Sequence, residues 1–293
     1  MSATTSTKKQ KQIEIPRSTI ASWVLYSIRR TIGEEDVRNA ILKKLVPANP
    51  KRIYGKTFVV FIDENKPLES QQTAYYKRIL KYLDTITGPK YKDMQVCITI
   101  ANFPAKVELD TDTESDANND TPLYETHYIT LIINNDVSSR NVIYMDPART
   151  PSGDIGIYES LVIPDVLHKY FETKKYVEQY KQVTAAAQTT YDDVFCQSWS
   201  LYLMKETLLG KDTIEIPSSK KARYELLLSF WKEANKSILF QTVLREDFTS
   251  LIDIDIAESL SNDSNKNKLI LSFYRAFDPV EFLASMTPND VKL

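Results

Sequence analysis

Residues 126–146 read THYITLIINNDVSSRNVIYMD, and they carry the clearest structural signal in the chain. Residues 126–133 and 141–146 are two runs of β-branched and aromatic side chains, a composition typical of strands. The stretch 134–139 between them is rich in Asn, Asp and Ser, which favour turns. The pattern therefore predicts a β-hairpin.

The expected pairing of this hairpin brings an imidazole to a carboxylate. If Ile133 lies opposite Arg140 and the strands pair without a bulge, His127 lies opposite Asp146 at the open end. Side chains directly opposite each other have Cβ atoms about 4.5–5.5 Å apart. A carboxylate at that distance would orient His127, fix its tautomer and stabilise its protonated form.

A second signal lies in residues 195–209, FCQSWSLYLMKETLL, which form an apolar helical pattern closed by Gly210. Cys196 falls in the first turn of this helix, after Asp192 and Asp193, either of which is a suitable N-cap. The helix dipole and the unpaired N–H groups of a first turn favour a thiolate. The same N–H groups stabilise an oxyanion at an attacked carbonyl.

Together these residues are the parts of a Cys-His-Asp hydrolase, with His127 activating the Cys196 thiol and Asp146 orienting His127. Each residue alone has an ordinary interpretation as a strand histidine, a core cysteine or a turn-forming aspartate. Cys97 lies in the middle of the strand pattern MQVCITI and is expected in the core. His168 lies in a helical pattern and is expected at or near the surface.

Helix and strand patterns alternate along the rest of the chain. Strands are expected at 57–62 and 94–100, and helices at 18–28, 34–45, 70–85, most of 158–182, 222–244 and 269–284. Helices flanking a few strands, with at least one hairpin, predict an α+β fold. We expect a central mixed, mostly antiparallel sheet packed on the helix that bears Cys196.

We divide the chain into four parts. Residues 1–12 are polar and basic and are expected to form a disordered tail. Residues 13–90 are interpreted as an N-terminal extension of helices and a strand, and 91–210 as the core that carries the site. Residues 211–293 are interpreted as a helical C-terminal segment packed on that core.

Composition argues against several classes of protein. The 37 Lys and Arg face 39 Asp and Glu, which does not favour a protein built mainly to hold nucleic acid. Only the basic tail suggests a nucleic-acid contact. Six scattered Gly cannot build a phosphate-binding loop, and two His with two Cys are too few for a usual zinc site. We therefore expect neither a cofactor nor a metal.

No apolar run is long enough to cross a bilayer, and the N-terminus has no apolar signal-peptide core. We therefore expect no membrane partner. Two cysteines cannot build a disulfide framework, which favours a reducing, cytoplasmic location. The acidic stretch 108–125 is expected to be a solvated loop, because it lacks the glycine and the terminal Glu of an EF-hand.

The order of the candidate residues resembles the adenovirus-type and ubiquitin-like-protein-specific cysteine proteases, most of all the processing proteases of large DNA viruses. The shared pattern is His then an aromatic residue at a strand start (His127-Tyr128), Asp after the next strand (Asp146), and Cys at a helix start (Cys196). The resemblance covers about residues 95–210. It implies a cysteine endopeptidase that cleaves viral precursor proteins or ubiquitin-like conjugates, often after a small residue such as Gly, in the host cytoplasm or the virion.

The chain departs from the family pattern next to the cysteine. The family places an oxyanion-binding Gln six or seven residues before Cys, where this chain has Thr190 and Thr189. The nearest upstream Gln is Gln188, which can serve if the connecting turn carries one extra residue. Its other interpretation is a surface loop amide. Phe195 and Gln197 also stand where many members have Asp and Gly.

Two other functions remain open at this point. One is a catalytically inactive virion or interaction protein of the same fold, which the departures around Cys196 motivate. The other is an acyltransferase that uses the same Cys-His pair, which would transfer an acyl group from a thioester donor without cleaving a peptide.

Overall fold

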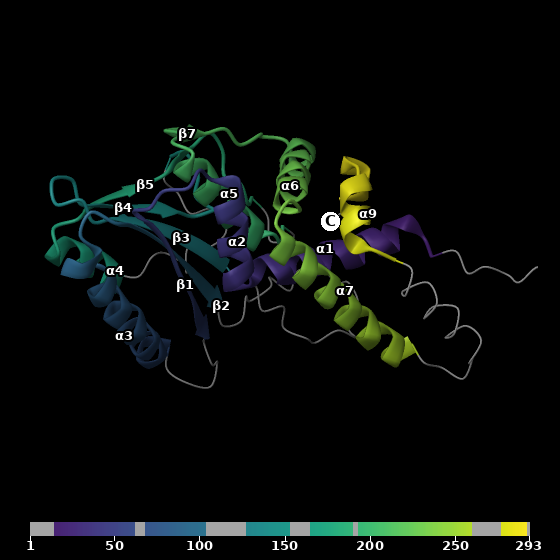
Figure 1. Cartoon of the computed structure of the whole chain (residues 1–293), viewed down its shortest axis with the longest axis horizontal. Coiled ribbons are helices and arrows are strands. Elements are labelled where there is room, and N and C mark those ends of the chain that lie inside the picture. Colours follow the sequence, from purple (N-terminus) through teal and green to yellow (C-terminus); the bar gives the residue numbers. More distant parts are fainter. Residues whose placement is uncertain are drawn as a thin grey trace, which may run out of the picture.

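The computed structural model describes residues 15–61, 68–103, 127–152, 165–189, 193–259 and 277–291. The described residues have the expected α+β architecture, in which helices cover both faces of a central sheet (Figure 1). The expected tail at 1–12, the acidic stretch 108–125 and residues 269–276 of the expected helix at 269–284 lie outside the described residues. Of the rest of that helix, the part from residue 279 is helical.

The central sheet is mixed. Its strands are β1 (Arg52–Phe61), β2 (Gln95–Phe103), β3 (His127–Asn134), β4 (Asn141–Met145) and β5 (Val177–Tyr180), in that spatial order. The two inner pairings, β2 with β3 and β3 with β4, are antiparallel. The two outer pairings, β1 with β2 and β4 with β5, are parallel. The predicted hairpin is therefore the pair β3–β4.

The register of that hairpin differs from the predicted one by two residues. Ile133 pairs with Val142 and not with the predicted Arg140. The turn is two residues longer than assumed, because Asp136 accepts hydrogen bonds from the backbone and side chain of Ser138 and forms its own compact turn. A shift of two residues keeps every side chain on the same face of the sheet, whereas a shift of one would reverse the faces.

The two faces of the sheet are covered by different helices. α3 (Leu68–Ile86) and α4 (Asp165–Thr173) lie over one face, and α5 (Cys196–Leu208) packs on β3 from the other (Figure 1). Alternating strand residues divide between the faces: Ile129, Leu131 and Ile133 join the core beneath α3 and α4, and Ile132 joins the core around α5.

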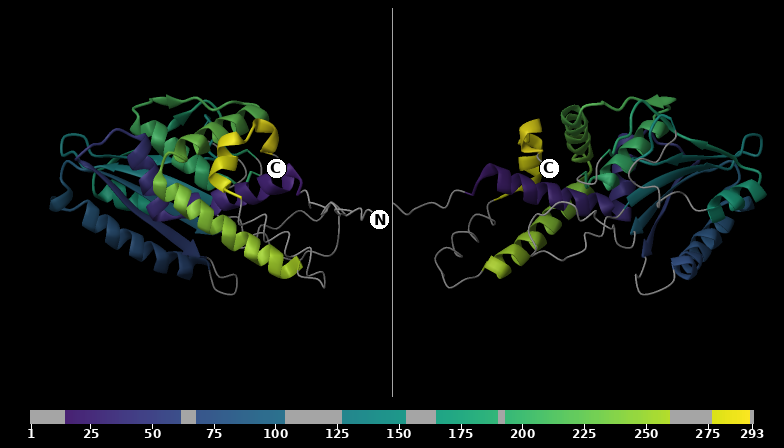
Figure 2. Two further views of the ribbon diagram at one scale, coloured as in Figure 1. Left: turned by 45° about the vertical axis from the view of Figure 1, so that its right-hand side comes forward. Right: turned by 180° about the vertical axis from the view of Figure 1, so that it is seen from behind.

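The larger core surrounds α5, whose first eleven residues are all buried. Its neighbours are α1 (Arg17–Gly33), α2 (Glu35–Leu45) and α6 (Lys220–Ala234). Further out, α7 (Ile238–Ser259) runs beside α1, and α9 (Pro279–Ser285) packs on α6 and α7 (Figure 2). A helix that is apolar all round must be enclosed by other elements, which is why helices from both ends of the chain converge on α5.

The remaining short elements complete the chain. They are the paired strands β6 (Gln182–Val183) and β7 (Thr213–Ile214), and the 3₁₀ turns η1 (Pro89–Tyr91) and η3 (Pro288–Asp290). β1, from the proposed N-terminal extension, is hydrogen-bonded into the central sheet through β2.

Two predicted helices are wrong in extent. The expected helix at 222–244 is two helices, α6 and α7, because the chain turns at Asn235 and Ser237. The Asn235 side chain donates to the Val280 carbonyl, and the Gln241 side chain donates to the Asn235 carbonyl, so this corner is held by contacts outside the helix. In the range 158–182 only α4 is helical among the described residues, and β5 follows it as an edge strand.

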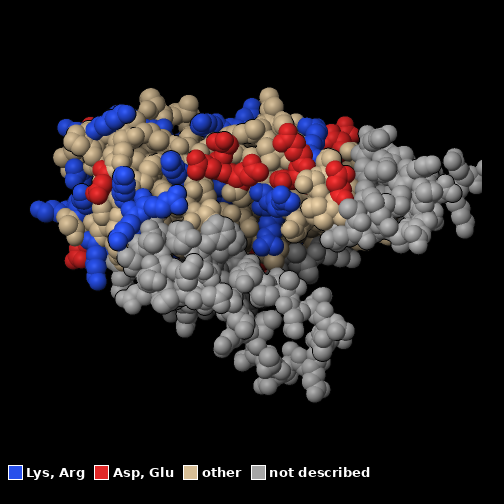
Figure 3. Space-filling model, turned by 90° about the horizontal axis from the view of Figure 1, so that it is seen from below, with Lys and Arg blue, Asp and Glu red and all other residues tan. Residues whose placement is uncertain are grey.

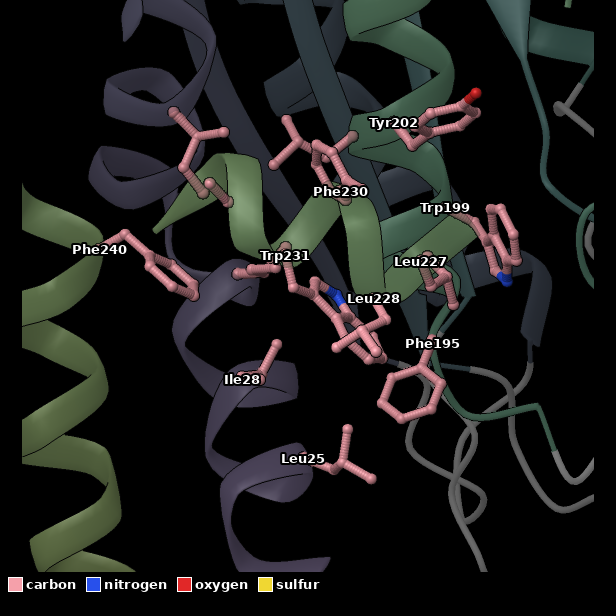
Figure 4. Packing of buried hydrophobic residues seen from close by; sticks show 14 of the residues in the cluster. Leu25, Ile28, Phe195, Trp199, Tyr202, Leu227, Leu228, Phe230, Trp231 and Phe240 are labelled. Atoms are coloured by element: carbon pink, nitrogen blue, oxygen red, sulfur yellow. The ribbon is translucent and has the colours of Figure 1, made fainter. Parts of the chain in front are cut away.

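Replacing Trp231 by alanine is expected to lower the free energy of unfolding by about 3–5 kcal/mol. Trp231 is fully buried, its ring centroid lies 4.9 Å from that of Phe195, and its Nε1 donates to Ser198 at 2.9 Å (Figure 4). Truncation leaves a cavity and a buried hydroxyl without its donor. Urea unfolding measures the change. Ile238→Ala is the control, because Ile238 is 79% exposed, and equal losses in both variants would contradict the packing argument.

Candidate active site

His127 and Asp146 form a buried pair at the end of the central sheet. His127 Nε2 lies 2.8 Å from Asp146 Oδ1, and the residues are 1% and 6% exposed. In the observed register Asp146 follows the last paired residue of β4 and lies diagonal to His127, not opposite it. Diagonal neighbours are about 7–8 Å apart, which long side chains can bridge. The predicted contact therefore forms, through a different pairing.

The carboxylate is itself held in place. Asp146 Oδ1 also accepts the backbone N–H of Ala148 at 2.9 Å, the side-chain turn that aspartate before proline favours. Because Nε2 is directed at this carboxylate, a neutral His127 carries its proton there. Nδ1 is then the ring nitrogen with a lone pair, and hence the atom that would take a proton from a thiol.

Cys196 is the first residue of α5 and meets the same strand end from the other face of the sheet. Its sulfur accepts a hydrogen bond from the backbone N–H of Tyr128, the residue after His127. Cys196, Tyr128 and Ala101 form a small buried cluster. The fold thus brings a helix-borne thiol to the beginning of β3, where the His127–Asp146 pair lies.

The thiol is closed off, which differs from the sequence-based expectation of an activated cysteine in an open groove. Cys196 is 2% exposed, and burial raises its pKa to about 12. Transfer of the sulfur out of water disfavours the thiolate more than the helix N-terminus favours it. In this conformation the thiol is therefore protonated at neutral pH. Segments 104–126 and 190–192, which lead into His127 and Asp193, lie outside the described residues.

The predicted N-cap of α5 is wrong. The helix begins after Phe195, and no side chain caps its first turn. Asp193 lies two residues before the N-cap position, Phe195, and its carboxylate accepts the Phe195 N–H and the Trp199 indole N–H, each at 3.1 Å. Asp193 therefore ties the segment before Cys196 to the second turn of α5. Asp192 lies outside the described residues.

Gln188 is buried between the two halves of the site. It is 2% exposed, its backbone N–H donates to the Pro147 carbonyl at 2.9 Å, and its side-chain amide donates to the Asp193 carbonyl. Pro147 follows Asp146, and Asp193 lies just before Cys196. The surface-loop interpretation of Gln188 is therefore wrong. The next residue, Thr189, accepts a hydrogen bond from the buried Arg223 at 2.8 Å, which helps to hold this segment.

Arg38, a buried arginine on α2, contacts the first turns of α5 and was not predicted as part of the site. Arg38 is 2% exposed and donates to the Gln197 carbonyl at 2.9 Å and to Ser200 at 3.0 Å. These partners lie about 160 residues away in sequence. No local pattern around Arg38 distinguishes it from a surface arginine, so only the tertiary structure reveals the contact.

The other cysteine and histidine lie away from this site. Cys97 is buried in the middle of β2, as expected, and burial raises its pKa to about 12. His168 lies on α4, where its Nδ1 is 2.6 Å from Glu178 on β5, and its side chain is 34% exposed. Cys97 and Cys196 are not joined in a disulfide. Neither His168 nor Cys97 therefore belongs to the candidate active site.

Other features bear on ligands and partners. Within the described ranges, no group of three or more His, Cys, Asp and Glu is arranged to hold a metal ion. None of the described helices combines the length and apolar character that a membrane span needs. Two surface hollows lie elsewhere, one of about 670 Å³ along α7 and one of about 490 Å³ beside β1. Basic and acidic side chains are mixed over the face in Figure 3.

Comparisons with known proteins identify no family for this chain, so the chemistry of the site is argued from its own residues. No protein-family model and no curated protein matches the chain. Among solved structures, the Legionella pneumophila effector protein RavZ is similar over 87% of this chain and 86% of its own, with 8% identity and a TM-score of 0.27. A likeness at this level carries no conclusion about fold or function.

Proposed function

We propose that this protein is a cysteine peptidase that uses Cys196, His127 and Asp146. The observation that carries the proposal is the buried 2.8 Å contact between His127 and Asp146, at the strand end that also receives the helix-borne thiol. Burying an aspartate is costly unless a partner compensates it, and here the partner is an imidazole. This pair would supply the general base of the proposed thiol hydrolase.

After the site opens and the sulfur reaches His127, the reaction begins with transfer of the Cys196 proton to Nδ1 of His127. The sulfur attacks the peptide carbonyl carbon, and a C–S bond forms. Collapse of the tetrahedral intermediate breaks the C–N bond, and the imidazolium returns its proton to the departing amine. Water, deprotonated by His127, then hydrolyses the thioester and regenerates the thiol. Asp146 stabilises the imidazolium at each stage.

The oxyanion would be held at the N-terminus of α5. The Cys196 backbone N–H is one donor, and the Gln188 side chain is the second. A glutamine amide has two N–H donors, and one of them is directed to the Asp193 carbonyl. That contact keeps the amide beside the segment leading to Cys196, and the second N–H can serve the oxyanion after the site opens.

The substrate classes follow from the resemblance to viral processing and ubiquitin-like-protein-specific proteases. The substrate would be a precursor polyprotein or a ubiquitin-like conjugate, cut after a small residue, in the host cytoplasm or the virion. Residues 91–210 would be the protease core, with 13–90 and 211–293 packed around it. The buried thiol requires that binding of the substrate or a partner open the site before catalysis.

One observation favours a second candidate, a non-catalytic interaction protein. Cys196 and His127 are both almost fully buried, and a thiol with a pKa of about 12 is a poor nucleophile at neutral pH. A closed site of this kind would also be expected of a protein that keeps the protease fold and has lost the activity.

Labelling with a peptide vinyl sulfone that ends in Gly, followed by site-resolved mass spectrometry, is expected to modify Cys196 and spare Cys97. Both thiols are buried, so exposure alone gives no preference, whereas only Cys196 lies at the strand end that carries the proposed general base. His127→Ala should abolish the preference. Equal or absent modification of the two cysteines in the native protein would instead support the non-catalytic candidate.

A further inference from the structure

Arg38 is a buried guanidinium whose hydrogen bonds all go to neutral acceptors. It donates to the carbonyls of Ile32 and Gln197 at 3.3 and 2.9 Å and to the Ser200 hydroxyl at 3.0 Å. Within the described ranges no carboxylate lies within ion-pair distance of it. A buried cation without an anionic partner is costly, and the burial lowers its pKa to about 10, still cationic at neutral pH. A cost of this kind points to a role other than stability.

The position of Arg38 links that charge to the thiol. Gln197 and Ser200 lie in the first two turns of α5, immediately after Cys196. The Arg38 guanidinium also lies 5.5 Å from the centre of the Tyr128 ring, and Tyr128 is in the buried cluster with Cys196. Arg38 therefore fixes the helix turn that carries the sulfur and places a positive charge beside it.

Arg29 approaches the same cluster from α1. Residues four apart on a helix share a face, so Arg29 lies on the same face as Gly33. A Cβ built on Gly33 would be 3.2 Å from the Tyr128 hydroxyl, which shows that this face of α1 contacts Tyr128 closely. Arg29 also acts electrostatically on Cys196 and Tyr128, lowering the pKa of each. Its side chain is half-buried.

The charges that face the thiol are predominantly positive. The positive charges are Arg29 from α1 and Arg38 from α2, and the opposing charge is Asp193 in the segment before α5. Tyr128 on β3 packs in the same cluster as the sulfur, and His127 precedes it in the chain. The Asp193 carboxylate is occupied by the Phe195 N–H and the Trp199 indole. Reactive cysteines lie in electropositive surroundings of this kind, whereas structural cysteines in a core do not.

We propose that Arg29 and Arg38 form a cationic frame that positions Cys196 and stabilises its thiolate once the site is hydrated. Both arginines are positioning residues, because they act through the sulfur and the first turn of α5. The inference rests on the proposed function, since it assigns them to the same thiol. It adds that residues 17–45, outside the proposed protease core, contribute the electrostatics of the nucleophile.

The test is the pH dependence of iodoacetamide alkylation at Cys196 in the full chain, followed by site-resolved mass spectrometry. Only the thiolate is alkylated, and one nearby charge shifts a thiol pKa by about 1–3 units. Arg38→Met and Arg29→Met are each expected to slow alkylation at pH 7.5 by about tenfold or more and to move the profile to higher pH. Arg38→Lys keeps the positive charge but loses the planar guanidinium and its several N–H donors, so it should recover part of the alkylation rate.

Arg30→Met is the matched control, because Arg30 is next to Arg29 on α1 and its side chain is 46% exposed and directed to Asp247. If Arg38→Met does not fold, as judged by thermal melting, Arg29→Met still decides the question, because Arg29 is only half-buried. Alkylation rates in Arg29→Met and Arg30→Met that agree within about twofold would overturn the frame.

The readout separates this inference from the proposed function. Slower alkylation in the arginine variants of a chain that cleaves no peptide would support the frame and contradict the peptidase. Peptide cleavage with an unchanged alkylation profile in the same variants would support the peptidase and overturn the frame.

Discussion

Cys196→Ala is expected to reduce hydrolysis of a fluorogenic peptide amide ending in Gly by about 10⁴-fold or more, to the background rate. Without the sulfur no thioester forms, and the His127–Asp146 pair has no nucleophile to activate. The measurement is the initial rate of fluorophore release at saturating peptide and equal enzyme concentrations. The fold should survive, because the substitution removes one buried sulfur beside Tyr128 and Ala101 and leaves their packing largely in place.

Cys97→Ala is the matched control for this prediction. Cys97 is equally buried, and its pKa is raised to a similar value, but it lies mid-strand in β2 and away from His127. It should keep its hydrolytic rate within a few-fold while losing some stability. A Cys196→Ala protein that retains the native rate would rule out thiol catalysis at this position.

Asp146→Ala is expected to lower the same rate by up to about 10⁴-fold. The change removes the acceptor that holds Nε2 of His127, so the ring loses its fixed orientation and tautomer, and it also removes the acceptor for the Ala148 N–H. Asp146→Asn should lose less activity, because its amide oxygen can accept both hydrogen bonds from the position of Oδ1. It still lacks the charge that stabilises the imidazolium.

The order of these two variants separates orientation from charge. Comparing the specific rates of folded protein, with folding checked by circular dichroism, should rank native above Asn and Asn above Ala. Equal losses in the two variants would assign the effect to the charge alone. An Asp146→Ala protein as active as the native one would mean that the 2.8 Å contact serves only stability.

Each of these activity measurements requires that the buried Cys196 thiol become accessible to the substrate. Cys196 is buried with Tyr128 and Ala101, and helices from residues 17–45 lie against α5, so access to the sulfur needs movement of packed elements. Activity that appears only with a substrate or partner would fit such an opening, since a ligand favours the state it binds.

Much of the local structure could be predicted because its causes are local. The two β-branched runs form β3 and β4, the apolar pattern after residue 195 forms α5, and His127 and Asp146 lie on one face of the sheet. The face assignment survived a register error of two residues, because side chains alternate with a period of two. The helix break at Asn235 was not predictable from periodicity, since its stabilising partners lie on other elements.

What the amino-acid order determined by itself is the type of most main elements, though not of the edge strand β5, and the residue types of the candidate site, because propensity and alternation act over a few residues. The tertiary structure alone decided the burial of the thiol and the placing of Arg38 beside α5. Those properties depend on which distant segments pack together, as in the contact between Arg38 and Gln197, 159 residues apart. Desolvation and charge at Cys196 are sums over such neighbours, and no local pattern encodes them.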